Sequence, residues 1–196
     1  MIDKKERQPF IDVFLAKNQE LNLSAIRDEE GVFMKHVCDA LEILKVDEGK
    51  YIENAKDVID VGTGGWIPLL PLAAVFSDVH FTGLDSVRKK TIAISDMVET
   101  LWLHNVNVVR SRAEDHKKQY DVLTARAMAY VEELMQWCYR LVKKWGYFIL
   151  YKMWSEEEEI AVDAACEKYK LALESQHMYK LFPEDIQRVI YVMKKL

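Results

Sequence analysis

The chain has 196 residues, half of them hydrophobic, and a formal net charge of −5 at pH 7. This length and composition predict one domain with a substantial core. No run of about 18 apolar residues occurs, and residues 1–10 lack the apolar core of a secretory signal, so we expect a cytoplasmic protein without a membrane span. The acidic total weighs against a nucleic-acid partner, although a local basic face can coexist with it.

The cysteines and histidines give no sign of a metal site or a disulfide framework. The three cysteines, Cys38, Cys138 and Cys166, are odd in number, widely spaced and without a CxxC pair. The five histidines include no HxxxH pair. Free, mostly buried thiols and no bound metal are therefore expected.

The first 50 residues predict a helical extension. Residues 2–18 have the pattern of an amphipathic helix, with Phe10, Val13 and Phe14 on one face. A second helix follows Asp28, which is a suitable N-cap, and its apolar positions continue to Leu44.

From residue 57 the pattern changes to strands alternating with helices, which predicts βαβ units and a sheet covered on both faces. Strands are expected at 57–61, 79–84, 106–109, 120–124 and 147–151, and helices at 69–75, 88–101, 130–143 and 156–170. The segments 177–181 and 188–193 predict an antiparallel hairpin at the sheet edge. The predicted fold is α/β and doubly wound, with a mostly parallel seven-stranded sheet, and residues 51–196 form a single compact unit.

A glycine-rich turn follows the first predicted strand, in the segment Asp60-Val61-Gly62-Thr63-Gly64-Gly65. Glycines here let the backbone approach a ligand, although a tight strand-to-helix turn explains GxG alone equally well. Asp85, at the end of the second strand, can accept hydrogen bonds from two ribose hydroxyls or serve as an N-cap. A dinucleotide cofactor is disfavoured because Ile67 stands where GxGxxG needs its third glycine.

Two further candidate segments follow the third and fourth strands. Ala113 and Glu114 are placed to contact an adenine, although a charged surface turn is an equally good interpretation of residues 111–115. Arg126 follows a strand of apolar and small residues and needs a partner, which a phosphate or a base edge would supply.

Together these motifs resemble those of the RsmG (GidB) family of ribosomal RNA guanine-N7 methyltransferases. Residues 22–28, NLSAIRD, are similar to its NLTxxRD opening, and residues 36–40, HVCDA, to its RHxxDS helix. Further similar segments occur in family order at 60–71, 84–86, 111–114, 125–127, 150–152 and 187–188. The resemblance covers the chain from residue 20 onward.

The resemblance implies a class I methyltransferase of Rossmann-like fold that transfers a methyl group from S-adenosylmethionine to N7 of a guanine. Its partner would be small-subunit ribosomal RNA or the subunit itself, and the protein would act as a monomer. The implied cofactor-binding residues are Asp60, Gly62, Gly64, Asp85, Ala113, Glu114 and Arg126. The implied RNA-binding residues are Arg112, Arg126 and Arg188, and the implied catalytic residues are Arg126 and Lys152.

The sequence also departs from the family pattern where glycine is expected. Trp66 and Leu69 stand at the third and fourth glycines of the cofactor loop, and Trp102 and Trp145 occupy two other glycine-type places. We expect the Trp66 indole to fill part of the cofactor pocket and weaken binding. Two alternatives follow: a diverged or engineered RNA-binding module with this fold and weakened cofactor binding, or a small-molecule methyltransferase with a closed apolar pocket.

Overall fold

The computed structural model describes residues 4–181 and 185–196, and its centre is a seven-stranded sheet with strand order β3-β2-β1-β4-β5-β7-β6. The strands are β1 (Asp57–Val61), β2 (His80–Asp85), β3 (Val106–Arg110), β4 (Tyr120–Arg126), β5 (Val142–Met153), β6 (Leu171–Lys180) and β7 (Gln187–Lys195). Strands β1 to β5 pair in parallel, whereas β7 runs antiparallel to both β5 and β6. The predicted doubly wound sheet with a C-terminal hairpin is confirmed.

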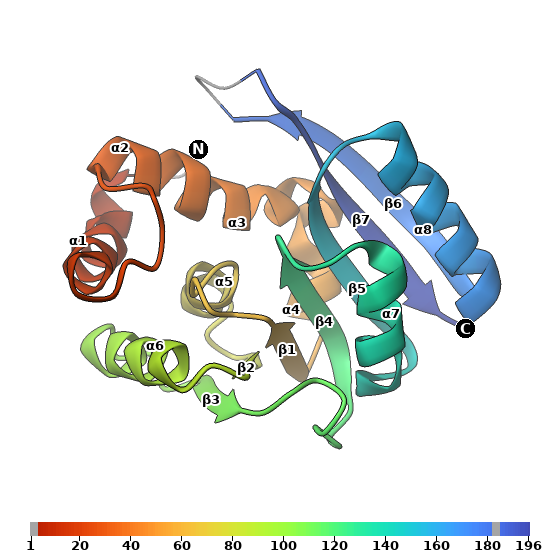
Figure 1. The fold of residues 1–196 in the computed structure, drawn as a ribbon, viewed down its shortest axis with the longest axis horizontal. Coiled ribbons are helices and arrows are strands. Elements are labelled where there is room, and N and C mark those ends of the chain that lie inside the picture. Colours follow the sequence, from red (N-terminus) through yellow and green to blue (C-terminus); the bar gives the residue numbers. More distant parts are fainter. Residues whose placement is uncertain (1–3, 182–184) are drawn as a thin grey trace.

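Helices cover both faces of this sheet (Figure 1). The α-helices are α1 (Lys4–Leu21), α2 (Glu29–Val32), α3 (Asp39–Leu41), α4 (Lys50–Glu53), α5 (Leu69–Val75), α6 (Arg88–Thr100), α7 (Val131–Cys138) and α8 (Glu156–Tyr169). A π-helical segment, Phe33–Cys38, joins α2 to α3, and short 3-10 segments lie at Glu42–Lys45, Asp47–Gly49 and Tyr139–Leu141. The predicted start of the first helix at Ile2 lies outside the described residues.

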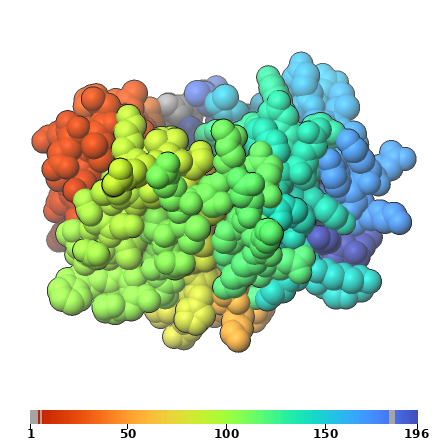
Figure 2. All heavy atoms as spheres, turned by 60° about the horizontal axis from the view of Figure 1, so that its bottom comes forward, coloured from red at the N-terminus to blue at the C-terminus, as the bar shows by residue number. Residues whose placement is uncertain are grey.

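Two hydrophobic clusters fix this arrangement, one on each face. The N-terminal helices, α5 and α6 pack on one face, where Ile11 and Phe14 of α1 join Val58 of β1 in one buried cluster. Helices α7 and α8 pack on the other, where Leu134 and Val162 join the cluster. In Figure 2 the N-terminal helices and the C-terminal elements lie at opposite ends of the visible face, with residues from about 80 to 130 between them.

Three predicted boundaries were wrong by five residues or more, and strand pairing explains them. The helix expected at 130–143 ends at Cys138, and the strand expected from 147 begins at Val142, because Val142 already pairs with Tyr120 of β4. The strand expected from 177 begins at Leu171, which pairs with Lys195 of β7. Side chains of β6 are mostly exposed, so hydrophobic alternation does not reveal the start of this edge strand.

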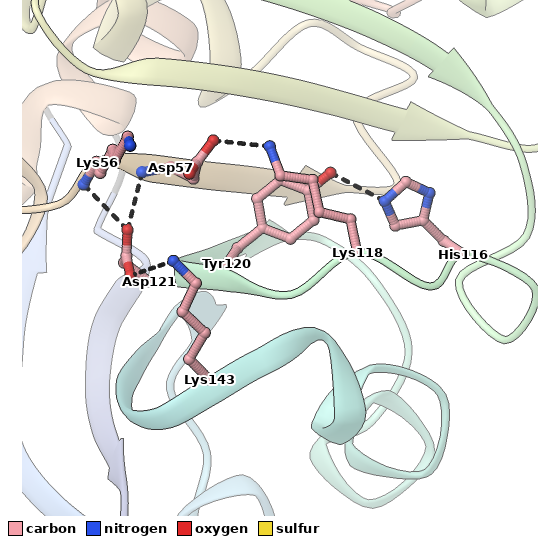
Figure 3. A network of polar contacts seen from close by, with 7 residues as sticks. All are labelled: Lys56, Asp57, His116, Lys118, Tyr120, Asp121 and Lys143. Atoms are coloured by element: carbon pink, nitrogen blue, oxygen red, sulfur yellow. Dashed lines mark hydrogen bonds and ion pairs between the residues drawn. The ribbon is translucent and has the colours of Figure 1, made fainter.

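A network of ion pairs and hydrogen bonds closes the edge of the sheet where β1 and β4 begin (Figure 3). The Asp121 carboxylate accepts hydrogen bonds from the backbone N–H groups of Lys56 and Asp57, at 3.0 and 2.9 Å, and from Lys143 Nζ at 2.7 Å. Lys118 Nζ donates to Asp57 at 2.7 Å. We call this the amino edge; the opposite edge, where β1 to β4 end, is the carboxyl edge.

No helix among residues 4–181 and 185–196 is long and apolar enough to cross a membrane.

Candidate functional site

Three adjoining cavities lie at the carboxyl edge, named here by a residue or loop that lines each. The Asp85 cavity, of about 380 Å³, lies over the ends of β1, β2 and β3. The glycine-loop cavity, of about 240 Å³, lies between residues 62–65 and the N-terminal helices. The Arg126 cavity, of about 720 Å³, lies over the ends of β4 and β5 and the start of β7. Ala127 lines all three, so they meet at the turn that follows β4.

Two glycines keep the chain after β1 clear for close approach. Gly62 has φ of +70°, and a Cβ there would lie 2.5 Å from the Met128 sulfur. A Cβ on Gly64 would lie 2.6 Å from Asp85 Oδ2 and 2.7 Å from Lys90 Nζ. Any side chain at either position would therefore narrow the passage between the Asp85 and glycine-loop cavities.

One carboxylate oxygen of Asp85 accepts a hydrogen bond in the turn after β2, and the other lies at the cavity. Its Oδ1 accepts a hydrogen bond from the Val87 N–H at 2.8 Å, just before α6 begins at Arg88. Its Oδ2 lies beside Gly64, and the residue is 8% exposed. The N-cap of α6 is Val87, so Asp85 is not the N-cap as predicted; it stabilises the turn before the helix, and an acceptor remains for a ligand hydroxyl.

Asp60 lies beneath the glycine-rich turn and is 1% exposed. Thr124 Oγ1 of the paired strand β4 donates to it at 2.8 Å. Burial raises the pKa of Asp60 to about 7, against smaller opposing effects of hydrogen bonds from Thr63 and Thr124. Asp60 is not among the described residues that line the three cavities. Asp60 therefore supports the turn from below, and its predicted contact with the cofactor stays a prediction.

The segment after β3 lines the Asp85 cavity as expected, with Arg112, Ala113 and Glu114 all on its wall. The Arg140 guanidinium donates to the carbonyl oxygen of Ala113 at 2.8 Å and also to that of Glu114. These bonds fix the backbone of the segment. The side chain of Arg112 is exposed, so it is free to meet a ligand that enters from outside.

Arg126 and Arg188 converge on one buried carboxylate. Asp39, the first residue of α3, is 1% exposed; its Oδ2 lies 3.1 Å from Arg126 Nη1 and its Oδ1 3.7 Å from Arg188 Nη1. The Tyr179 hydroxyl also donates to Asp39 Oδ1, at 2.6 Å. All three predicted RNA-binding arginines lie at the carboxyl edge, two of them together and Arg112 apart over the neighbouring cavity.

Lys152 enters the same cavity from the end of β5. Its Nζ lies 2.7 Å from Glu158 Oε1 and donates to the Ala129 carbonyl oxygen at 2.7 Å; both charged side chains are 9% exposed. Glu158 lies three residues after Ser155, whose hydroxyl caps α8 by accepting a hydrogen bond from the Glu158 N–H. Sequence reasoning missed Asp39 and Glu158 as site residues. The acidic run at 156–159 is typical of a solvated helix start, and Ser-x-x-Glu spacing also suits a capping box, so neither pattern indicates a site residue.

The structure contradicts the expected position of Trp66. Its side chain is fully buried and packs against Phe14 of α1, with ring centroids 5.0 Å apart, and against the His36 ring at 6.1 Å. Trp66 is not among the described residues lining the cavities. The apolar side chains of α1 draw the indole into the core, away from the ligand, so the predicted obstruction of the cofactor pocket is wrong.

His36 forms the roof of the glycine-loop cavity. Burial, together with the nearby Arg126 charge, lowers its pKa to about 4, so the ring is neutral at pH 7. Its Nε2 lies 3.3 Å from Ser24 Oγ, and Arg126 Nη2 lies 3.4 Å from its Nδ1. The N-terminal helices thereby contribute directly to the wall of the site.

The residues of these cavities fit S-adenosylmethionine. The Asp85 cavity offers an acceptor for ribose hydroxyls and the Ala113–Glu114 backbone beside an adenine, and the Gly62–Gly65 turn leaves room for the methionine part. No group of three or more potential metal ligands occurs among the residues that the structure describes. Fold and site together define a class I methyltransferase.

Comparison with known proteins identifies the family. Residues 3–188 match the GidB family model, described as rRNA small subunit methyltransferase G. A protein named ribosomal RNA small subunit methyltransferase G from Lysinibacillus sphaericus is 32% identical over 95% of this chain and 80% of its own length. One of the same name from Thermoanaerobacter sp. is 34% identical over 96% and 80%. The chain belongs to this family.

Solved structures of lower identity show the same fold. TrmN from Thermus thermophilus superposes with a TM-score of 0.63 at 15% identity, over 80% of this chain and 48% of that one. A putative methyltransferase from Bacillus halodurans gives a TM-score of 0.62 at 15% identity, over 81% and 99%.

Proposed function

We propose that the protein transfers a methyl group from S-adenosylmethionine to N7 of a guanine in small-subunit ribosomal RNA. The observation that carries this proposal is the meeting of the three cavities at Ala127. The Asp85 and glycine-loop cavities would hold the cofactor, and the Arg126 cavity, which adjoins both at Ala127, would hold the base. The arginines there suit the phosphates and the O6 edge of a guanine, because a guanidinium presents fixed, planar donors.

The chemistry asks little of the protein beyond orientation. The cofactor supplies an electrophilic methyl group, and guanine N7 has a lone pair and no proton, so no general base is needed. Arg126 and Lys152 would position the base, and Gly62 and Gly64 would allow close approach. Holding the two partners in line and excluding water accounts for the acceleration.

Two observations favour this function over the alternatives. A small-molecule methyltransferase would have a closed apolar pocket, whereas the Arg126 cavity is lined by Arg126, Lys152, Arg188 and three carboxylates. An RNA-binding module with weakened cofactor binding was suggested by Trp66, whose indole lies in the core and leaves the pocket clear. We further propose that the protein acts in the cytoplasm as a monomer, which light scattering would check.

A methyl-transfer assay tests the proposal. The purified protein is incubated with methyl-labelled cofactor and small-subunit ribosomal RNA, both naked and as the assembled subunit, and the RNA is then digested to nucleosides. We expect label in 7-methylguanosine in at least one of the two substrates. Weak cofactor binding together with no label in either substrate would instead support the RNA-binding module, and label in another nucleoside would refute the N7 assignment.

A further inference from the structure

We propose that the Lys152–Glu158 pair reads the Watson–Crick edge of the target base and selects guanine. This proposal rests on the proposed function and adds the residues that set base specificity. Both side chains are nine-tenths buried, and both line the Arg126 cavity. Buried charges in a cavity of this size are costly unless they gain partners, and a bound base would supply them.

The pair has hydrogen-bonding capacity left over. An ammonium group has three donors; Lys152 Nζ donates a hydrogen bond to the Ala129 carbonyl oxygen and forms an ion pair with Glu158 Oε1, each at 2.7 Å. One donor remains. A carboxylate accepts about four hydrogen bonds, and Lys152 occupies one site on the Glu158 carboxylate. The pair therefore presents one donor beside several acceptors.

Guanine matches this pattern and adenine opposes it. The Watson–Crick edge of guanine presents O6 as an acceptor, then N1–H and the exocyclic amine as donors. Adenine presents an amine donor and then N1 as an acceptor. In the same position, the lone pair of adenine N1 would face the lone pairs of the Glu158 carboxylate and repel them. A buried polar group without a hydrogen-bond partner costs considerable free energy. The pair therefore discriminates guanine from adenine more strongly than the shape of the cavity alone would.

Binding of the Watson–Crick edge by Lys152 and Glu158 also leaves the reacting atom, N7, accessible. N7 lies on the other edge of the guanine, and Arg126 and Ala127, which the Arg126 cavity shares with the glycine-loop cavity, lie on the cofactor side. Two exposed aromatic side chains on the cavity wall, Tyr130 at 73% and Trp154 at 40%, provide surfaces for stacking an unpaired base. These features are those expected of a site that takes a base out of its stack.

The test replaces the target guanosine, once located by the assay above, with inosine, which lacks the exocyclic amine. For the wild type we expect kcat/KM to fall about 10- to 100-fold on inosine, the range for losing a hydrogen bond to a charged group. For Glu158→Gln we expect a lower rate on guanosine and a guanosine-to-inosine ratio below about 3. The matched control Glu156→Gln removes a charge from the exposed start of the same helix and should keep the wild-type ratio.

The outcomes separate this proposal from a structural ion pair and from failure of the proposed function. Wild-type protein that methylates inosine and guanosine equally well overturns base reading by Glu158, without need of any variant. An unchanged guanosine-to-inosine ratio in Glu158→Gln also overturns it and assigns the pair a structural role. Absence of 7-methylguanosine with the natural substrate overturns the proposed function itself. Cofactor affinity should be the same in all three proteins.

A second, independent observation concerns three of the five tryptophans. Trp66, Trp102 and Trp145 have φ of 65°, 53° and 67°, the left-handed region that favours glycine. Trp102 and Trp145 are 78% and 57% exposed, so little burial offsets this conformation, and the buried Trp66 Nε1 has no hydrogen-bond partner within the described residues. The chain has 7 glycines, about half the usual share of roughly 7%.

We infer that glycine occupies positions 66, 102 and 145 in the protein made by its own cells. A codon that one genetic code reads as tryptophan and another as glycine, such as UGA, accounts for all three exchanges together. Glycine at 66 would also restore the third glycine of the cofactor loop. Peptide mass spectrometry of protein isolated from its natural source should find glycine at all three positions. Tryptophan at any of them would overturn the inference.

Discussion

The two edges of the central sheet use charged residues differently. At the amino edge, the Lys143–Asp121 side chains are 40% and 31% exposed and the Lys118–Asp57 side chains 54% and 18%. At the carboxyl edge, Asp39 is 1% exposed between two arginines, and Lys152 and Glu158 are both 9% exposed. Exposed pairs contribute little to stability and buried ones are costly to desolvate, so the buried charges indicate binding and chemistry rather than stability.

The pKa values of two aspartates show the same difference. Although partial burial opposes it, hydrogen bonds from Lys143 and two backbone N–H groups hold the pKa of Asp121 below its ordinary value. Full burial raises the pKa of Asp60 to about 7 despite hydrogen bonds from Thr63 and Thr124. A carboxylate at the amino edge is therefore stabilised in its charged form, and one beneath the carboxyl edge is not.

The largest expected effect comes from removing one charge at each edge. Asp39→Asn removes the buried carboxylate that Arg126 and Arg188, each 17% exposed, share, and should lower the free energy of unfolding by about 3–5 kcal/mol. The matched change Asp121→Asn should cost about 1 kcal/mol or less. Chemical denaturation of both variants provides the comparison. Equal losses would contradict the distinction between the edges.

A smaller effect is expected on cofactor binding. Asp85→Ala removes the acceptor that remains beside Gly64, at a cost of about 1.5–3 kcal/mol for hydrogen bonds to a charged group, or one to two orders of magnitude in affinity. Asp57→Ala at the amino edge should leave affinity unchanged. Calorimetric titration with S-adenosylmethionine measures both. Retained affinity in Asp85→Ala would refute the ribose assignment.

The raised pKa of Asp60 predicts a pH dependence of stability. Its ordinary value is 3.8 and its folded value about 7, so between these values the folded state holds a proton that the unfolded state has lost. The stabilisation is complete below about pH 4 and is lost as pH rises to about 7. Wild-type protein should therefore lose stability relative to Asp60→Asn across this window. The titration of His36 contributes equally to both proteins, so it does not affect the difference between their free energies of unfolding. If that difference stayed constant between about pH 4 and 7, the raised pKa of Asp60 would be contradicted.

The smallest effect concerns the exposed left-handed tryptophans. Trp102→Gly and Trp145→Gly each relieve about 1–2 kcal/mol of backbone strain and lose about 0.5–1 kcal/mol to the entropy of glycine. Each should therefore raise the free energy of unfolding by up to about 1 kcal/mol. Thermal unfolding of the two single variants measures this. A clear loss of stability in both would show that the indole contacts outweigh the strain.

Much of the fold could be predicted because it depends on local patterns. β1 and α5 have the predicted bounds, since a β-branched run ends at a glycine and an apolar helix follows a proline. The start of β6 could not be predicted, because its residues are mostly exposed and pairing with β7 alone makes them a strand. The helix expected after Asp28 contains a π-helical segment at Phe33–Cys38, which no pattern of residues in the sequence predicted.

The site residues that lie at the ends of strands could be predicted from the sequence. Those that reach the site only through long-range contacts could not. Asp85, Arg112 and Arg126 come directly after or at the ends of parallel strands, so topology brings them to one edge. Asp39 and Glu158 reach that edge from helices, and only tertiary packing shows that each faces a cation of the site. Trp66 was misplaced for the same reason, because Phe14, its partner, lies 52 positions away in α1.

The most direct test of the account compares methyl transfer by two variants that each remove one positive charge. Arg126→Gln changes the carboxyl edge where the three cavities meet, and Lys143→Gln changes an ion pair of the amino edge. We expect Arg126→Gln to lower kcat/KM on small-subunit ribosomal RNA by about 100-fold or more, equivalent to about 2.7 kcal/mol of transition-state stabilisation. Lys143→Gln should match the wild type. Equal activity of the two variants, whether high or low, would contradict the assignment of function to the carboxyl edge.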